Sequence, residues 1–113
     1  MIVMTKATIY RSKNGDITGF DIRGHAGSAN NGEFDMVCAA ISAVAYTALG
    51  GLDEICCVNT YKESDGNLRM FLPDNMASDA WTRAQIILET MEIGLKQIEN
   101  EYSRYIQVIT KEV

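Results

Sequence analysis

Two stretches near the start of the chain alternate apolar and polar residues, which is the period of a β-strand. They run from Ile2 to Tyr10 and from Ile17 to Arg23. Between them lies Asn14-Gly15, a pair that favours a tight turn between two paired strands. The first part of the chain is therefore expected to form a β-hairpin.

Two later stretches have helical patterns. Met36 to Leu49 has 12 apolar residues of 14, and Gly50-Gly51 is expected to end this helix. A helix that is apolar on every side needs a cover on every side, from the sheet beneath and from another helix or a second subunit above. Further on, apolar residues recur at steps of four and three along one face of a long helix: Ala77, Trp81, Ala84, Leu88, Met91, Leu95 and Ile98. The charged residues of the opposite face are expected to be solvated: Asp79, Arg83, Glu89, Glu92, Lys96 and Glu99.

Three more strands complete the pattern. Glu54 to Tyr61 and Asn67 to Leu72 flank an Asp65-Gly66 turn, and Ser103 to Thr110 alternates again. The resulting order, ββαββαβ, predicts an α+β fold in which a mixed sheet is covered by two helices. Because 113 residues have room for one core, a single domain is expected over residues 1–113.

Composition narrows the class of protein. The hydrophobic content of 47%, the charged content of 22% and the single proline are those of an ordinary globular chain. A net charge of −5, with no run of Lys or Arg, argues against direct binding of nucleic acid and favours a basic partner. Met36 to Leu49, the longest apolar stretch, is shorter than the roughly 20 residues of a membrane span, and the N-terminus lacks a signal-peptide pattern. We therefore expect a cytoplasmic protein without membrane association.

The three cysteines fit a reducing compartment. Cys56 and Cys57 are adjacent, so on the expected strand they point to opposite faces and are poorly placed to pair. The chain has no Cys-x-x-Cys motif, and one histidine cannot supply a His-based metal cluster. Neither a metal site nor a cofactor is expected.

The only histidine and the best-placed thiol lie close together in the sequence. His25 follows the second strand, and Cys38 falls in the first turn of the helix from Met36, where unpaired amides and the helix dipole favour a thiolate. A base and a nucleophile on two rigid elements can form a covalent active site. Singly, a histidine at a strand end or a cysteine in an Ala-rich helix is more often structural. The residues alone leave these two interpretations about equal.

Neighbouring residues are candidates to support this pair. Asp35 is placed to cap the helix through a first-turn amide, an interpretation we prefer to that of a third catalytic residue, although both roles can coexist if the cap fixes how Cys38 faces His25. Ser42 follows Cys38 by one turn, where its hydroxyl can support the thiol or bond the Cys38 carbonyl. An oxyanion needs preorganised donors, and amides at the helix start or in the preceding loop are the candidates. The loop glycines expected to act as hinges are Gly24, Gly27 and Gly32.

Two blocks of this segment resemble the signature of a known family. They are Gly24-His25-Ala26-Gly27 and, after Gly32 and Asp35, Val37-Cys38-Ala39-Ala40-Ile41-Ser42. The pattern is similar to that of the bacterial ribosomal-processing cysteine proteases, which are short single domains with this order of elements. The resemblance implies a cysteine endopeptidase in which Cys38 is the nucleophile and His25 the base. It also implies a homodimer, and as substrate a ribosomal protein precursor, because family members trim an N-terminal extension from ribosomal large-subunit protein twenty-seven.

Two other functions stay open on the sequence. One is a non-enzymatic, ribosome-associated assembly factor in which His25 and Cys38 are structural. The other is a thiol-dependent enzyme acting on small molecules, which predicts turnover without any peptide. The peptidase is the first hypothesis and the assembly factor the second.

Overall fold

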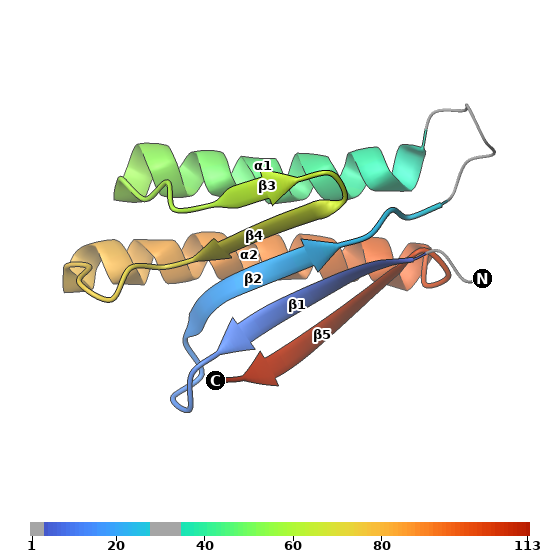
Figure 1. The fold of residues 1–113 in the computed structure, drawn as a ribbon. Coiled ribbons are helices and arrows are strands. Elements are labelled where there is room, and N and C mark those ends of the chain that lie inside the picture. The colour runs from blue at the N-terminus through green and yellow to red at the C-terminus, as the bar shows by residue number, and fades with distance from the viewer. Residues whose placement is uncertain (1–3, 28–34) are drawn as a thin grey trace.

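Seven elements follow one another in the predicted order (Figure 1). The structure is a computed structural model that describes residues 4–27 and 35–113. The strands are β1 (Thr5–Arg11), β2 (Ile17–Arg23), β3 (Lys62–Ser64), β4 (Asn67–Phe71) and β5 (Ile106–Glu112). The helices are α1 (Met36–Cys56) and α2 (Ser78–Glu101). The order ββαββαβ is confirmed.

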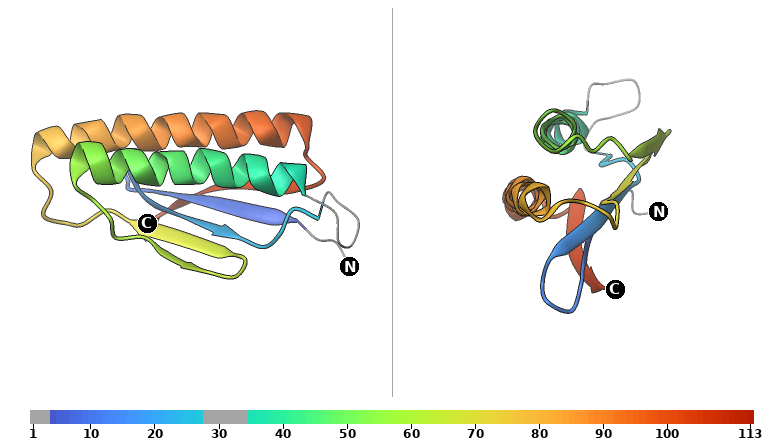
Figure 2. Two further views of the ribbon diagram at one scale, coloured as in Figure 1. Left: turned by 90° about the horizontal axis from the view of Figure 1, so that it is seen from above. Right: turned by 90° about the vertical axis from the view of Figure 1, so that its left-hand side faces the viewer.

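The strands form one mixed sheet in the order β3-β4-β2-β1-β5. β1 and β2 form the predicted hairpin, in which Ala7 lies opposite Ile22, and β4 is antiparallel to β2 on its other side. β5 runs parallel to β1, because α2 returns the chain before it enters this edge strand. Both helices lie on one face of the sheet and leave the other face open (Figure 2). The predicted α+β fold with two covering helices is confirmed.

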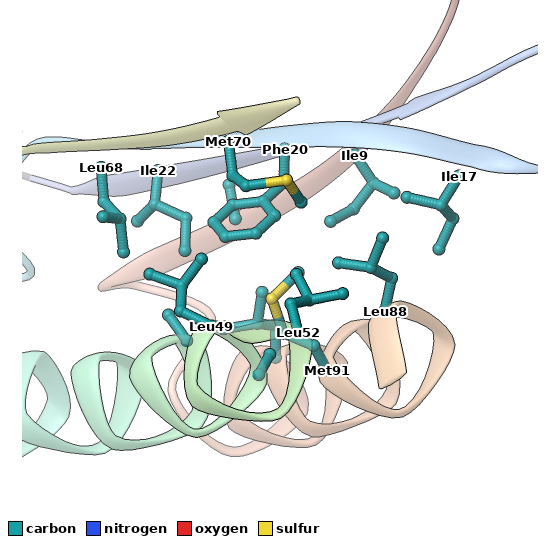
Figure 3. Packing of buried hydrophobic residues seen from close by; sticks show 14 of the residues in the cluster. Ile9, Ile17, Phe20, Ile22, Leu49, Leu52, Leu68, Met70, Leu88 and Met91 are labelled. Atoms are coloured by element: carbon teal, nitrogen blue, oxygen red, sulfur yellow. The ribbon is translucent and has the colours of Figure 1, made fainter. Parts of the chain in front are cut away.

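The core fills the space between the sheet and the helices (Figure 3). Strand residues alternate between the two faces, so β1 buries Ala7 and Ile9 while β2 buries Phe20 and Ile22. The helices point Leu49, Leu52, Leu88 and Met91 at these side chains. Removal of this apolar surface from water is the main force that joins the layers.

The end of α1 differs from the prediction. The helix does not stop at Gly50-Gly51 but continues to Cys56, so the predicted strand from Glu54 to Tyr61 is wrong. The strand that precedes the Asp65-Gly66 turn is the short β3. Cys56 therefore ends a helix and is buried, while Cys57 follows it with φ +57° and is exposed. The three cysteines are free thiols.

Packing explains why the helix continues past the two glycines. Leu52 and Cys56 are buried in the core, so the extra turns remove apolar surface from water. Gly51 faces α2, where an added Cβ would lie 3.5 Å from the side chain of Ile87. Burial of these turns outweighs the low helix propensity of glycine, which costs about 1 kcal/mol per residue.

The described residues do not cover α1 on every side. Met36, Tyr46 and Ile55 are 65%, 43% and 54% exposed, so the expected cover on every side is not supplied by the described residues. The 21 residues of α1 also exceed the apolar stretch from Met36 to Leu49, whose length argued against a membrane span. Its length and composition would allow it to cross a membrane, and core helices of soluble proteins can share these properties; 33% of its most apolar 18-residue stretch is buried inside the molecule.

Glu92 departs from the predicted solvated face of α2. It is 4% exposed, with Arg11 Nη2 2.5 Å from its Oε1 and Lys96 Nζ 3.3 Å from its Oε2. Arg11 also pairs with Glu89, and its hydrogen bonds to Glu89 and Glu92 raise the pKa of Arg11. The buried carboxylate is thus compensated by two cations, and the cluster ties the end of β1 to α2.

Candidate active site

His25 follows β2 and is positioned by the glycine before it. Gly24 has φ +89°, and a Cβ there would lie 2.7 Å from the carbonyl oxygen of Met4, so only glycine fits. The Gly24 N–H donates to the Gly66 carbonyl at 2.8 Å and ties the end of β2 to the β3–β4 turn. This fixed backbone carries the imidazole of His25 to the surface, where 60% of the side chain is exposed.

Cys38 lies in the first turn of α1, as predicted, and is half-buried. Asp35 is the N-cap, and its Oδ1 accepts the Cys38 N–H at 2.9 Å. The Asp35 carbonyl accepts the Ala39 N–H at 3.0 Å. The cap therefore orients the turn that carries the thiol, and it engages two of the helix-start amides considered as oxyanion donors.

The thiol and the imidazole line one pocket of about 160 Å³. Its lining residues are Thr5, Ile22, Gly24, His25, Cys38, Ile41, Ser42, Ala45, Tyr46, Ser64, Gly66, Asn67 and Leu68. Within the described residues no hydrogen bond joins Cys38 to His25, and such bonds often form only when substrate is present. The volume lies below the roughly 300–1,000 Å³ of small-molecule sites, so the pocket suits one side chain or a peptide carbonyl.

The turn between β3 and β4 sets where the imidazole ring lies. Asp65 Oδ1 is 3.7 Å from His25 Nε2, but Asp65 is fully exposed, so water weakens this contact. Gly66 has φ +70°, and a Cβ there would lie 3.1 Å from the same nitrogen. The ring therefore rests against the bare backbone of Gly66.

Tyr46 joins α1 to the β3–β4 hairpin at the rim of this pocket. It follows Cys38 by two turns on the same side of α1, and its hydroxyl donates to Glu63 Oε2. The hydrogen bond to Glu63 and partial desolvation raise the pKa of Tyr46 to about 12. The phenol is protonated at neutral pH, as an unperturbed tyrosine also is, so it can donate this bond to Glu63 there.

The structure places the other predicted site residues in different ways. Ser42 lines the pocket beside Cys38, but within the described part of the chain its hydroxyl forms no hydrogen bond with Cys38. Gly27 has φ +68°, a conformation that favours glycine. Gly32 lies outside the described residues. One pocket thus gathers His25, Cys38 and Ser42, with Asp35 bonded to the backbone of Cys38.

Sequence reasoning missed the residues that the β3–β4 hairpin brings to the pocket. Gly66 lines the pocket and Asp65 lies near the His25 ring, but both were predicted only as a turn between two strands, because nothing local shows that this turn lies against His25. Tyr46 had a usable signal, since it continues the four-residue spacing of Cys38 and Ser42 along α1.

Two other features of the described chain bear on where the chemistry lies. A larger apolar groove of about 680 Å³ runs between α1 and α2, but neither Cys38 nor His25 lines it, and none of its lining residues is charged. Among residues 4–27 and 35–113, no group of three or more His, Cys, Asp or Glu side chains is placed to hold a metal ion. The smaller pocket is therefore the candidate active site.

Both the sequence and the fold match known proteins. The family described as cysteine protease Prp matches residues 4–107. The ribosomal processing cysteine protease Prp of Bacillus subtilis (strain 168) is 32% identical over 113 residues, which cover 95% of this chain and 97% of the relative. Crystal structures of the ribosomal processing protease Prp from Staphylococcus aureus, with a covalently linked product peptide and with a substrate peptide, give TM-scores of 0.76 and 0.75. Each is 26% identical, and each comparison covers 96% of this chain and 100% of the other.

Proposed function

The chain belongs to the Prp family of cysteine proteases, and on that premise we propose that Cys38 is its nucleophile and His25 its general base. The observation that carries the proposal is that the capped thiol and the chain's only imidazole line one pocket. A family name gives the class of reaction, and this pocket supplies a base and a nucleophile for it.

The proposed reaction proceeds through a thioester. His25 takes the thiol proton, and Sγ of Cys38 attacks the carbonyl carbon of the scissile bond. The tetrahedral intermediate collapses, the C–N bond breaks, and His25 gives its proton to the leaving amine. Water then loses a proton to His25 and hydrolyses the thioester, which frees the thiol.

The imidazole has to turn toward the thiol for the first step. In the described structure its Nε2 faces Asp65 and no bond to Cys38 is in place. With 60% of its side chain exposed, His25 has space to turn when a peptide enters. During this turn Cys38 stays in place, because Asp35 accepts a hydrogen bond from its backbone amide.

The proposed substrate is the precursor of ribosomal large-subunit protein twenty-seven, cut after a short N-terminal extension. The name of the Bacillus subtilis relative and the substrate peptide bound to the Staphylococcus aureus protein support a ribosomal peptide substrate. The net charge of −5 also favours encounter with a basic ribosomal protein. Tyr46 at the rim of the pocket is suited to contact aromatic residues just before the cut.

The proposed assembly is a cytoplasmic homodimer. The groove between α1 and α2 is apolar and exposes Ile86 and Ile93 at 63% and 57%, a surface that a second copy would cover. Three free thiols are typical of a reducing compartment.

The test uses a peptide that copies the N-terminal extension of the host's ribosomal large-subunit protein twenty-seven, with products identified by mass spectrometry. The parent protein should cut one bond, whereas Cys38→Ala and His25→Ala should cut none. Cys57→Ala is the matched control, because it removes an exposed thiol that does not line the pocket. It should cut like the parent.

Two results would contradict the proposal. Cleavage by Cys38→Ala would show that another group is the nucleophile, and full cleavage by His25→Ala would exclude His25 as the base. If the parent leaves both the peptide and the full-length precursor intact, the assembly-factor hypothesis becomes the better one. A Cys38→Ala variant with full cellular function would then support it.

A further inference from the structure

The open face of the sheet collects positive charge. Strand register and burial place five cations on it, all exposed: Lys6, Arg23, Lys62, Arg69 and Lys111. Among the outward positions of the five described strands, the one acidic residue is Asp21. This face therefore has a formal charge of +4 in a chain of net charge −5, so the remainder carries −9.

Two of the cross-strand pairs on this face have like charge. Lys6 of β1 is directly opposite Arg23 of β2, and Lys62 of β3 is directly opposite Arg69 of β4. Like charges in such positions repel and destabilise a sheet. These pairs are therefore expected to lower the free energy of unfolding, and a bound polyanion would offset the repulsion between the cations.

Asp21 does not neutralise the face. Its side chain is nearly buried, and its Oδ2 accepts from Arg23 Nε at 2.9 Å. Its Oδ1 has no hydrogen-bond partner in the described part of the chain. Arg23 is 63% exposed despite this bond, so Asp21 fixes the base of the Arg23 side chain and leaves its end in solvent.

Two aromatic rings extend the charged surface. Phe71 is 40% exposed and lies over Gly19, where a Cβ would be only 2.5 Å from its ring. Tyr10 packs beside it with ring centroids 5.2 Å apart, and the Arg69 guanidinium lies 5.4 Å from the Phe71 centroid. A sheet face that combines Arg side chains with an exposed ring such as Phe71 and a partly exposed one such as Tyr10 is a surface on which bases of a single strand can stack.

We propose that this open sheet face binds single-stranded RNA. Phosphates complement the cations, the rings accept bases, and the face has the open form that a strand can follow rather than a closed pocket. Only the choice of RNA over other polyanions rests on the proposed ribosomal function. Apart from Asp21 the acidic residues lie elsewhere, and the register of the strands gathers cations that are scattered in sequence, so this face can attract phosphates although the net charge is −5.

The RNA face adjoins the candidate active site. Ser64 and Asn67 line the pocket and occupy the same cross-strand row as Arg23 and Lys6. RNA on the sheet would therefore bring a ribosomal protein that is bound to the same RNA next to Cys38. The face adds retention near the substrate and takes no part in the chemistry.

The experiment measures fluorescence anisotropy of a fluorescein-labelled, twelve-nucleotide oligouridylate titrated with the whole protein. Binding is expected at low salt, with a slope of log K against log salt of about −2, which corresponds to three phosphate contacts on a single strand. The double variant Lys6→Gln/Arg69→Gln should weaken binding about tenfold at about 50 mM salt. It should still cleave the substrate peptide at the parent rate, since neither residue lines the pocket.

The matched control is Lys13→Gln/Arg83→Gln, which removes one Lys and one Arg from the β1–β2 turn and from α2. It should bind the oligouridylate within about twofold of the parent. Urea unfolding confirms that both double variants fold. A parent protein that binds oligouridylate but does not cleave the peptide would overturn the proposed protease function and not the RNA proposal. A parent protein that cleaves the peptide but does not bind oligouridylate would do the reverse.

Three outcomes would overturn the RNA proposal. The first is no salt-dependent anisotropy change with the parent protein. The second is equal weakening by both double variants, which would assign the effect to net charge. The third is that a poly-glutamate peptide competes as well as oligouridylate at equal charge, which would make the partner an acidic polypeptide.

Discussion

Gly66 determines where the imidazole of His25 lies without contributing a side chain. A Cβ at this position would be 3.1 Å from His25 Nε2, so the ring would have to move by a few tenths of an ångström. We expect Gly66→Ala to lower kcat for the substrate peptide about tenfold, because the added methyl group would displace the imidazole that has to turn toward the thiol. KM should change less than twofold, because the other contacts of the peptide are unchanged. Steady-state cleavage kinetics measure both.

Gly15→Ala is the control for this substitution. Both glycines lie in hairpin turns with positive φ, +93° for Gly15 and +70° for Gly66, so alanine strains each backbone by about 1 kcal/mol. Nothing lies within 4 Å of a Cβ at Gly15, so only the other variant disturbs the imidazole. Equal falls in kcat for the two variants would assign the effect to stability. An unchanged kcat for Gly66→Ala would show that the contact does not matter.

Single residues were predictable where their role depends on near neighbours. Asp35 follows this rule, since a helix start and an acidic residue before it suffice to predict the cap, and its bond to the Cys38 amide is as expected. Gly66 does not, because its role depends on a contact with His25 across 41 positions of sequence. The prediction that Glu92 is solvated was wrong for the same reason, because its partner Arg11 lies on a strand that is distant in sequence.

Helix α1 shows how tertiary packing overrides local signals. The two glycines predict an end at Leu49, yet Leu52 and Cys56 are buried and carry the helix onward. The helix ends at Cys57, whose φ of +57° is one that glycine adopts without strain. The actual terminator has no sequence signal, and this is why the strand expected from Glu54 was wrong.

The strained end of α1 can be relieved. Cys57→Gly should raise the free energy of unfolding by between about 0.5 and 1 kcal/mol. Glycine adopts the left-handed conformation without a Cβ clash, and the greater conformational freedom of glycine in the unfolded chain offsets part of this gain. Cys57 is exposed, so little packing is lost. Urea unfolding followed by circular dichroism measures the change. Cys57→Ala removes the same thiol without relieving φ, and a glycine variant no more stable than this control would contradict the explanation.

At the scale of the whole molecule, the order and type of elements followed from periodicity, while their arrangement did not. Periods of two and of three to four are local properties, so ββαββαβ and the α+β fold could be predicted. The strand order β3-β4-β2-β1-β5 depends on pairing between distant segments. The charged sheet face depends on the same pairing, so the net charge and the spacing of Lys and Arg in the sequence could not predict it.

The proposed homodimer is also a property of the whole molecule. The groove between α1 and α2 lies on the helical layer, opposite the charged sheet face, so both surfaces can be used at once (Figure 2). We expect Ile86→Lys/Ile93→Lys to convert a dimer into a folded monomer, because two lysines at an apolar interface lose hydration without gaining partners. Sedimentation velocity over a range of concentrations measures the mass.

The control for this effect uses apolar side chains of similar exposure outside the groove. Ile55 and Val113 are 54% and 60% exposed and do not line it, so Ile55→Lys/Val113→Lys should leave the dimer intact. Since Cys38 and His25 belong to one chain and neither lines the groove, the monomeric variant should still cleave the substrate peptide. A parent protein that sediments as a monomer at every concentration would contradict the dimer. If the variant with both lysines in the groove is still a dimer, the interface must lie on another face.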